Sequence, residues 1–189
     1  MKVRSICLGP LATNAYLVEQ DGVRILIDPA EASDRLMEFV GATPPDFVLN
    51  THGHFDHVGG TWAFPGVPTA IHRSDLEMVD AFFPKHPTYD RWLTEDGDPV
   101  AGLTVLHTPG HSPGSVVFYA PGVLFAGDLL FAGSIGRTDL PGGSHPDMQA
   151  SLRRLFALGE EFVVYPGHGE PTTLERERRY NPFVRGLLR

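Results

Sequence analysis

The chain has 189 residues, of which 42% are hydrophobic and 20% are charged. This balance excludes a fibrous or wholly disordered protein, and the length suits one well-buried domain. The formal net charge of −8 argues against nucleic acid as a partner, because nucleic-acid binding usually needs a basic face.

The predicted elements begin with short β-prone runs that end in turn signals. Runs at 15–18 and 23–27 flank Asp21-Gly22, a pair that predicts a hairpin. A helix over 31–40 ends at Gly41, and a buried strand over 46–49 follows it. The remaining predicted strands are 69–72, 103–106, 115–119, 123–126 and 162–165.

Helical patterns lie between these later strands. They cover 74–83 and 146–158, and the second is opened by Ser144 and closed by Gly159. The sign-alternating segment 175–179 is typical of a solvated helix. Strands come first as a hairpin-rich block and then alternate with helices, which predicts a mixed α/β fold. Because no repeat or linker interrupts the pattern, we expect one domain over 1–189.

Nine histidines accompany only two lysines, and the histidines cluster. The segment from Thr51 to His57 reads H-x-H-x-D-H directly after a predicted strand. Alternating residues of an extended segment point to the same side, so His52 and His54 can bind one ion. Asp56 and His57 follow a turn and can face a second ion. Imidazole and carboxylate ligands suit zinc, and also iron or manganese.

Three later residues share one context, a strand end next to glycine or proline. They are His111, Asp128 and His168. Such turns can present a side chain into a cleft, although an aspartate there can also bond its own backbone. With the first motif they supply five imidazoles and two carboxylates, enough for two ions with positions left for water.

This ordered set resembles the metallo-β-lactamase superfamily. The resemblance implies an αβ/βα four-layer sandwich of two mixed β-sheets flanked by helices. It implies one metal at His52, His54 and His111, and a second at Asp56, His57 and His168. Asp128 would bridge the two, which argues against antibiotic hydrolysis because the B1 and B3 β-lactamases lack a bridging aspartate.

Two further stretches narrow the branch. Gly127-Asp128-Leu129-Leu130-Phe131 with Gly136-Arg137-Thr138-Asp139 resembles glyoxalase II and its single-domain relatives. The segments Gly167-His168-Gly169-Glu170-Pro171-Thr172-Thr173 and Tyr180-Asn181-Pro182-Phe183 do so as well. The resemblance implies a thioesterase similar to hydroxyacylglutathione hydrolase.

The expected chemistry is hydrolysis of a small-molecule thioester or ester. Two cations about 3.5–4 Å apart can lower the pKa of a bridging water from ~15.7 toward ~7. We hypothesise that the resulting hydroxide attacks the carbonyl, while Asp56 orients it and handles its proton. Arg137 is the substrate-binding candidate, because a guanidinium can grip a carboxylate, and pairing with Asp139 is the alternative.

Other readings stay open. Persulfide dioxygenases share this fold and a Gly-Arg-Thr-Asp stretch, and they would hold one iron at His52, His111 and Asp128. Lactone or phosphodiester hydrolysis uses the same hydroxide, and a non-catalytic metal-binding scaffold is a third reading. Aromatic residues between Phe82 and Trp92 favour core packing over a flap or a homodimer contact.

The expected location is the cytoplasm. The single cysteine, Cys7, cannot form an internal disulfide, which suits a reducing compartment. The N-terminal segment has no apolar stretch followed by a small-residue cleavage site. No run of about 20 apolar residues is present, so we expect no membrane partner.

Overall fold

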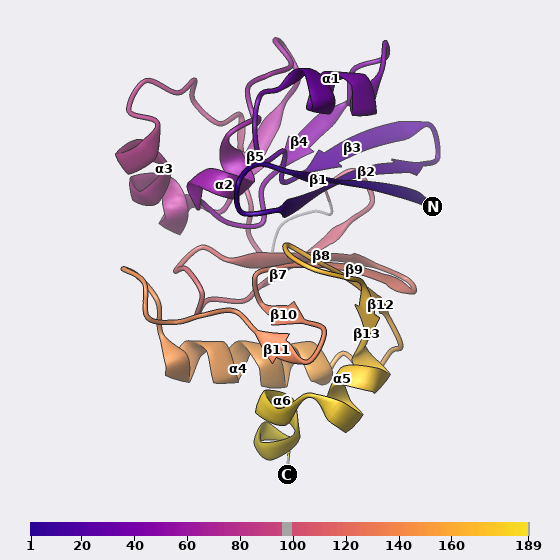
Figure 1. Cartoon of the computed structure of the whole chain (residues 1–189), viewed down its shortest axis with the longest axis vertical. Helices are drawn as coiled ribbons and strands as arrows, with labels where there is room; N and C mark the ends of the chain where they lie inside the picture. The colour runs from indigo at the N-terminus through magenta and orange to yellow at the C-terminus, as the bar shows by residue number, and fades with distance from the viewer. Residues whose placement is uncertain (96–99, 189) are drawn as a thin grey trace. The chain divides into compact units, whose positions relative to one another are not determined.

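The computed structural model describes residues 1–95 and 100–188. The chain divides into two compact units, Met1–Leu93 and Thr94–Arg189, and each has a mixed sheet with helices packed on it (Figure 1). Whether the two units behave as one domain stays a prediction.

The first unit is built on a six-stranded sheet in sequence order. The first three strands pair antiparallel with one another. The third strand then pairs parallel with the fourth, and the parallel pairing continues to the sixth. They are β1 (Lys2–Leu8), β2 (Thr13–Gln20), β3 (Val23–Ile27), β4 (Phe47–Leu49), β5 (Thr69–Ile71) and β6 (Arg91–Trp92). The β2–β3 hairpin turns at Asp21 and Gly22, which both have positive φ, so this prediction is confirmed.

The helices of this unit follow its parallel strands. They are α1 (Asp34–Val40), α2 (Phe55–Val58), the 3₁₀ turn η1 (Arg73–Asp75) and α3 (Leu76–Phe82). Helix α1 buries Leu36 and Val40 with Leu17 and Leu26 of the sheet. The predicted helix over 74–83 is therefore split, since a 3₁₀ turn precedes α3.

The second unit has a five-stranded sheet in the order β13-β12-β9-β8-β7, with one parallel pair, β9 with β12. Helices α4, α5 and α6 lie on one side of it (Figure 1). The bounds are β7 (Thr104–His107), β8 (Val116–Ala120), β9 (Val123–Gly127), β10 (Leu130–Phe131), β11 (Ser134–Ile135), α4 (His145–Phe156), β12 (Val163–Pro166), β13 (Thr172–Thr173), α5 (Leu174–Tyr180) and α6 (Pro182–Leu187).

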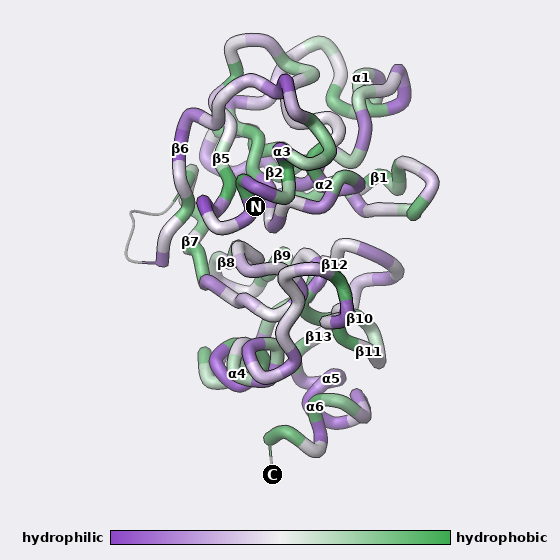
Figure 2. Tube along the Cα trace, turned by 90° about the vertical axis from the view of Figure 1, so that its left-hand side faces the viewer, coloured by the Kyte–Doolittle hydropathy of each residue, from purple (hydrophilic) through white to green (hydrophobic). Residues whose placement is uncertain are grey.

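Burial explains why these segments form. Helix α4 places Met148, Leu152 and Leu155 in one core cluster with Leu124 and Val164 of the sheet. Hydropathy along the trace shows hydrophobic positions in strands of both sheets (Figure 2). Among the described residues, no helix combines the length and the apolar character that a bilayer crossing needs.

Several predicted boundaries need correction. The Ser144 hydroxyl caps α4 as predicted, but the helix ends at the Ala157 cap rather than at Gly159. Helix α1 begins at Asp34 rather than at residue 31, because the Ser33 hydroxyl accepts from the Leu36 amide and caps it there. The segment 175–179 is helical as predicted, yet Glu177 is buried rather than solvated.

Candidate metal centre

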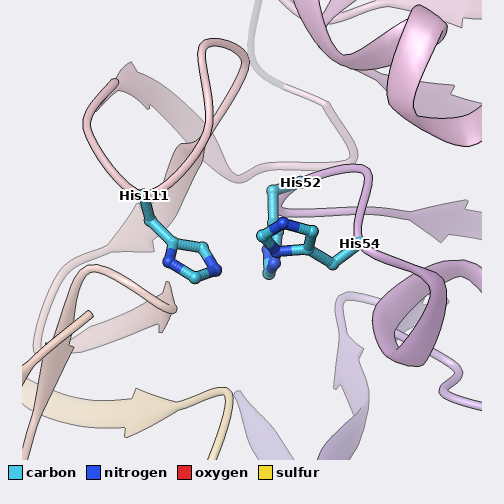
Figure 3. Close-up of side chains that lie close together, drawn as sticks. All are labelled: His52, His54 and His111. Carbon is cyan, nitrogen blue, oxygen red and sulfur yellow. The ribbon is translucent and has the colours of Figure 1, made fainter. Parts of the chain in front are cut away.

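The first unit gathers four of the predicted ligands just beyond β4. His52 follows the strand, His54 is the N-cap residue of α2, and Asp56 and His57 lie on that helix. The rings of His52 and His54 lie close together (Figure 3), with their centroids 4.8 Å apart. The ring centroids of His52 and His57 are 4.0 Å apart. His52, Asp56 and His57 are buried. The short helix therefore folds the motif into one cluster.

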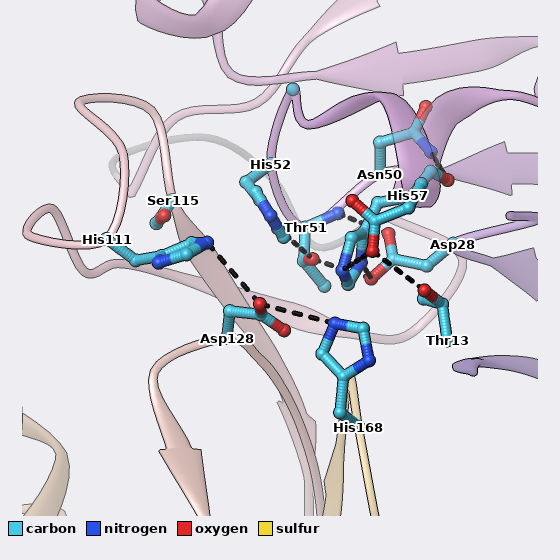
Figure 4. A network of polar contacts seen from close by, with 12 residues as sticks. Thr13, Asp28, Asn50, Thr51, His52, His57, His111, Ser115, Asp128 and His168 are labelled. Carbon is cyan, nitrogen blue, oxygen red and sulfur yellow. Dashed lines mark hydrogen bonds and ion pairs between the residues drawn. The ribbon is translucent and has the colours of Figure 1, made fainter. Parts of the chain in front are cut away.

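A buried carboxylate that the sequence reading missed organises this cluster. Asp28 lies after β3, and its Oδ1 accepts a hydrogen bond of 2.7 Å from the Thr51 amide. Its Oδ2 accepts from the Thr51 hydroxyl at 2.6 Å and lies 2.9 Å from Nδ1 of His57. Figure 4 shows Asp28, Thr51 and His57 close together. An ionised carboxylate only accepts, so Nδ1 of His57 carries the proton.

The same reasoning fixes the ring of His52. The Thr51 hydroxyl donates to Asp28, so it can only accept from Nδ1 of His52, which lies 3.1 Å away. As neutral imidazoles, both rings keep their proton on Nδ1 and offer the lone pair of Nε2. This arrangement, an outer acceptor behind each imidazole, is the one that orients histidine ligands toward a metal ion.

Asp56 is held in the same cluster by another residue absent from the predictions. The Thr13 hydroxyl donates to Oδ2 of Asp56 at 2.8 Å, and this oxygen lies 3.5 Å from Nε2 of His57. When His57 is neutral, with its proton on Nδ1, two lone pairs face each other across that distance. A cation between them removes the repulsion, so the donor set fits a divalent metal.

The backbone between His52 and His54 is fixed by a further buried acid. The amide of Gly53 donates to Oδ2 of Asp75 at 2.8 Å. A Cβ at Gly53 would lie only 2.8 Å from the Asp75 carbonyl oxygen, so only glycine fits here without movement. Asp75 therefore holds the loop that carries both histidines.

The second unit brings its three predicted ligands together. His111 and His168 each place Nε2 near Oδ2 of Asp128, at 3.4 and 3.5 Å (Figure 4). Nδ1 of His111 lies 2.8 Å from the Arg137 carbonyl oxygen, which can only accept, so Nε2 of His111 again offers its lone pair. Lone pairs of His111 and Asp128 thus converge in the second unit as well.

Glycines permit this second cluster. A Cβ at Gly136 would lie 1.8 Å from the Asp128 carbonyl oxygen, so no side chain fits where the chain returns past Asp128. Gly127, directly before Asp128, has φ +48°, a conformation that most side chains avoid. The predicted role of glycine in turning the backbone next to a ligand is confirmed at Gly127.

Arg137 is exposed and pairs with Asp139. Its Nε and Nη2 donate to the two carboxylate oxygens at 2.8 and 2.7 Å. These hydrogen bonds lower the pKa of Asp139 to about 2, so the pair persists at neutral pH. The structure therefore contains the Arg137–Asp139 pair that was the alternative to substrate binding. The second edge of the guanidinium, formed by Nη1 and Nη2, points away from this bidentate contact.

The remaining histidines and aromatics have structural contacts. His72 caps η1, and Nε2 of His107 lies 2.9 Å from the Pro113 carbonyl oxygen. Tyr89 is buried in a core cluster with Phe83 and Trp92 packed against it, whereas Phe82 is exposed. Core packing is thus confirmed for Phe83, Tyr89 and Trp92 but not for Phe82.

Comparison with known proteins identifies the family of this chain. The model of the metallo-β-lactamase superfamily matches residues 8–168. Hydroxyacylglutathione hydrolase GloC of Haemophilus influenzae is 34% identical over 97% of this chain and 98% of its own length. The crystal structure of TTHA1623 in a di-iron-bound form has 43% identity and a TM-score of 0.88, covering 95% of this chain and 99% of the other.

The crystal structure of BLEG-1, a B3 metallo-β-lactamase, is 34% identical with a TM-score of 0.85, covering 97% of this chain and 99% of the other. These likenesses confirm the predicted α/β fold class. The chain belongs to the metallo-β-lactamase superfamily.

Proposed function

We propose that this protein is a dinuclear-metal-dependent thioester hydrolase of the glyoxalase II type, acting on hydroxyacylglutathione or a related thioester. The observation that carries the proposal is the convergence of imidazole Nε2 atoms and carboxylates in each unit, with the far nitrogens of His52, His57 and His111 bonded to outer oxygen atoms. The likeness to a hydroxyacylglutathione hydrolase supports the choice of substrate class.

The ligands divide between two ions. His52, His54 and His111 would hold one, Asp56, His57 and His168 the other, with Asp128 between them. When bound, such a pair of ions supplies hydroxide at neutral pH and polarises a carbonyl oxygen. Zinc, iron and manganese all suit these ligands, and the di-iron form of a relative makes iron a serious alternative to zinc.

This chain's own residues would orient the reactants. Thr13 fixes Oδ2 of Asp56, so the other carboxylate oxygen is positioned to accept the proton of the nucleophile. Asp139 fixes Nε and Nη2 of Arg137, which leaves the Nη1 and Nη2 edge to bind a substrate carboxylate. The ion pair with Asp139 thus orients the Arg137 guanidinium for substrate binding, and it does not occupy the edge that would bind the substrate.

The decisive experiment follows the thioester absorbance of S-D-lactoylglutathione with protein loaded with zinc, iron or manganese. We expect saturable loss of absorbance that disappears after chelation and returns with added metal. Absence of turnover by protein that holds two ions would contradict the proposed substrate class. The same preparations identify the preferred metal by comparing kcat/KM at equal metal content.

Replacement of Arg137 by alanine tests the substrate clamp. We expect KM to rise about 10–150-fold, with a smaller change in kcat, because a bidentate charged hydrogen bond contributes roughly 1.5–3 kcal/mol. Asp139→Asn should show part of the same effect, since it weakens the contact that orients the guanidinium. Because the pKa of Asp139 is about 2, KM should not respond to its ionisation above pH 4. An unchanged KM in Arg137→Ala would remove this residue from the site.

Persulfide oxidation is the principal alternative, with one iron at His52, His111 and Asp128. Oxygen consumption on glutathione persulfide by iron-loaded protein, together with inactivity on the thioester, would establish it. Nitrocefin, a lactone and a phosphodiester are tested as further substrates, because each represents another hydrolytic activity of the same kind of site. Hydrolysis of nitrocefin is included because BLEG-1 is a B3 metallo-β-lactamase.

A further inference from the structure

The short hairpin β10–β11 connects the three candidate ligands of the second unit. It begins two residues after Asp128, and the chain returns beside the Asp128 carbonyl at Gly136. The next residue, Arg137, supplies the carbonyl oxygen that accepts from His111. The hairpin therefore starts just after one ligand, Asp128, and ends just before Arg137, whose carbonyl oxygen supports another ligand, His111.

The hairpin also contacts the third ligand. Phe131 of β10 packs edge-on against the ring of His168, with the centroids 6.1 Å apart. A displacement of β10–β11 would therefore disturb the surroundings of His111, Asp128 and His168 together. Only two residue pairs join its strands, so the hairpin needs support from outside.

That support is a buried carboxylate on α5. The Glu177 side chain is only 1% exposed, and its Oε2 accepts from the Gly133 amide in the hairpin turn at 2.8 Å. The same oxygen accepts from Nδ2 of Asn181 at 2.9 Å, while Oε1 accepts from the Thr172 hydroxyl at 2.6 Å. Three donors thus converge on one buried carboxylate.

Asn181 makes a second connection to the hairpin. Its Nδ2 donates to the Ser134 carbonyl oxygen at 3.0 Å as well as to Glu177. Its Oδ1 accepts from the Phe183 amide and caps α6. The side chains of Glu177 and Asn181 together bind both the donor and the acceptor of adjacent backbone positions in the hairpin turn.

We propose that Glu177 and Asn181 are positioning residues for the metal centre, which act by fastening the β10–β11 hairpin that supports His111, Asp128 and His168. This inference rests on the metal site of the proposed function, but it does not depend on the substrate. A buried acid costs free energy unless it is fully hydrogen-bonded. Here one of its hydrogen bonds comes from the hairpin turn at Gly133, and a second comes from Asn181, which also binds that turn.

The test measures metal binding rather than turnover. Apo protein is titrated with zinc against a chromophoric chelator, in the wild type and in Glu177→Gln, Glu177→Ala and Asn181→Ala. Loss of an outer partner typically lowers metal affinity 10–100-fold. We expect a loss of about tenfold in Glu177→Ala and a smaller loss in Glu177→Gln, since glutamine retains one acceptor. Cobalt-substituted protein should show a changed d–d absorption spectrum, because the ligand geometry shifts.

Two controls separate positioning from stability. Glu175→Gln removes an exposed acid from the same helix and should leave zinc affinity and spectrum unchanged. Leu155→Ala opens the core of the second unit and should lower the melting temperature of apo protein without changing zinc affinity. Wild-type zinc affinity in folded Glu177→Ala and Asn181→Ala would overturn the inference, as would a loss no larger than in Leu155→Ala.

The outcomes also separate this inference from the proposed function. A wild-type protein that binds two ions but leaves thioesters intact contradicts the substrate class, while the zinc titrations still decide the role of Glu177. A wild-type protein that binds no metal contradicts both proposals.

Discussion

Replacement of His54 by alanine is expected to abolish turnover while leaving the fold intact. His54 is the N-cap residue of α2, but its side chain makes no capping hydrogen bond to that helix. The substitution therefore removes no cap, and we expect the melting temperature of apo protein to change by only about 2–4 °C, which corresponds to roughly 1 kcal/mol at this chain length.

The effect on chemistry should be much larger. Loss of an outer partner of a metal ligand already costs about 10–100-fold, so loss of a direct ligand should lower kcat/KM by more than about 100-fold. Bound metal should fall from two ions per chain toward one. Metal analysis and thioester kinetics measure both effects on the same sample.

An exposed histidine provides the matched control. His145 lies at the start of α4 and contacts Gln149. This helix carries none of the predicted metal ligands. His145→Ala should retain wild-type metal content and turnover. If His54→Ala kept two tightly bound ions and full activity, the assignment of the His52 to His57 motif as ligands would be wrong.

The candidate ligands could be found from the sequence because their local context is distinctive. His52, His54, Asp56 and His57 stand together after a β-prone run, so a strand end and a tight turn were enough to predict a cluster. The later ligands, such as His168, each adjoin a glycine. Short-range patterns of this kind depend on few neighbouring residues.

The outer residues depend on pairing between distant segments. Asp28 and Thr51 lie 23 positions apart, and the parallel register of Ile27 with Leu49 brings them together beyond the ends of β3 and β4. Asp28-Pro29 therefore looks like an ordinary turn in the sequence. Parallel strands that end at the same edge were the available signal, but it required the register to be known.

Glu177 shows the same limit more strongly. Its segment alternates in charge, which favours an exposed helix, and nothing within it predicts burial. The residue is buried because the turn at Gly133, 44 positions earlier, places a backbone amide against its carboxylate. Tertiary contact, rather than local pattern, decides the environment of this side chain.

Replacement of Asp28 by asparagine should damage both the metal site and the stability of the first unit. The carboxylate accepts from three donors, the amide and hydroxyl of Thr51 and Nδ1 of His57. Asparagine supplies one acceptor oxygen and one amino group in place of two acceptor oxygens. The amino group is itself a donor, so it must lie opposite at least one of the donors that the carboxylate satisfies. Each buried donor left unsatisfied costs about 1–3 kcal/mol.

Either orientation of the new amide also disturbs a candidate ligand, His57 in one case and His52 in the other. If the amino group faces Nδ1, the ring must move its proton to Nε2 in order to accept, and Nε2 can then no longer bind a metal ion. If the oxygen faces Nδ1, the amino group opposes the Thr51 amide and displaces the loop that leads to His52. We therefore expect metal affinity to fall by about 10–100-fold.

Urea unfolding of apo protein and zinc titration against a chelator measure the two losses separately. Asp21→Asn is the matched control, because Asp21 is an exposed hairpin residue with φ +52°, a conformation that asparagine also adopts readily. It should change neither quantity. Normal zinc affinity in Asp28→Asn would show that the proton of His57 is not fixed by Asp28, and that His57 reaches its ligand tautomer without this carboxylate. A loss of zinc affinity in Asp28→Asn with unchanged apo stability would instead separate the two roles, because the carboxylate would then orient the ligand without holding the unit together.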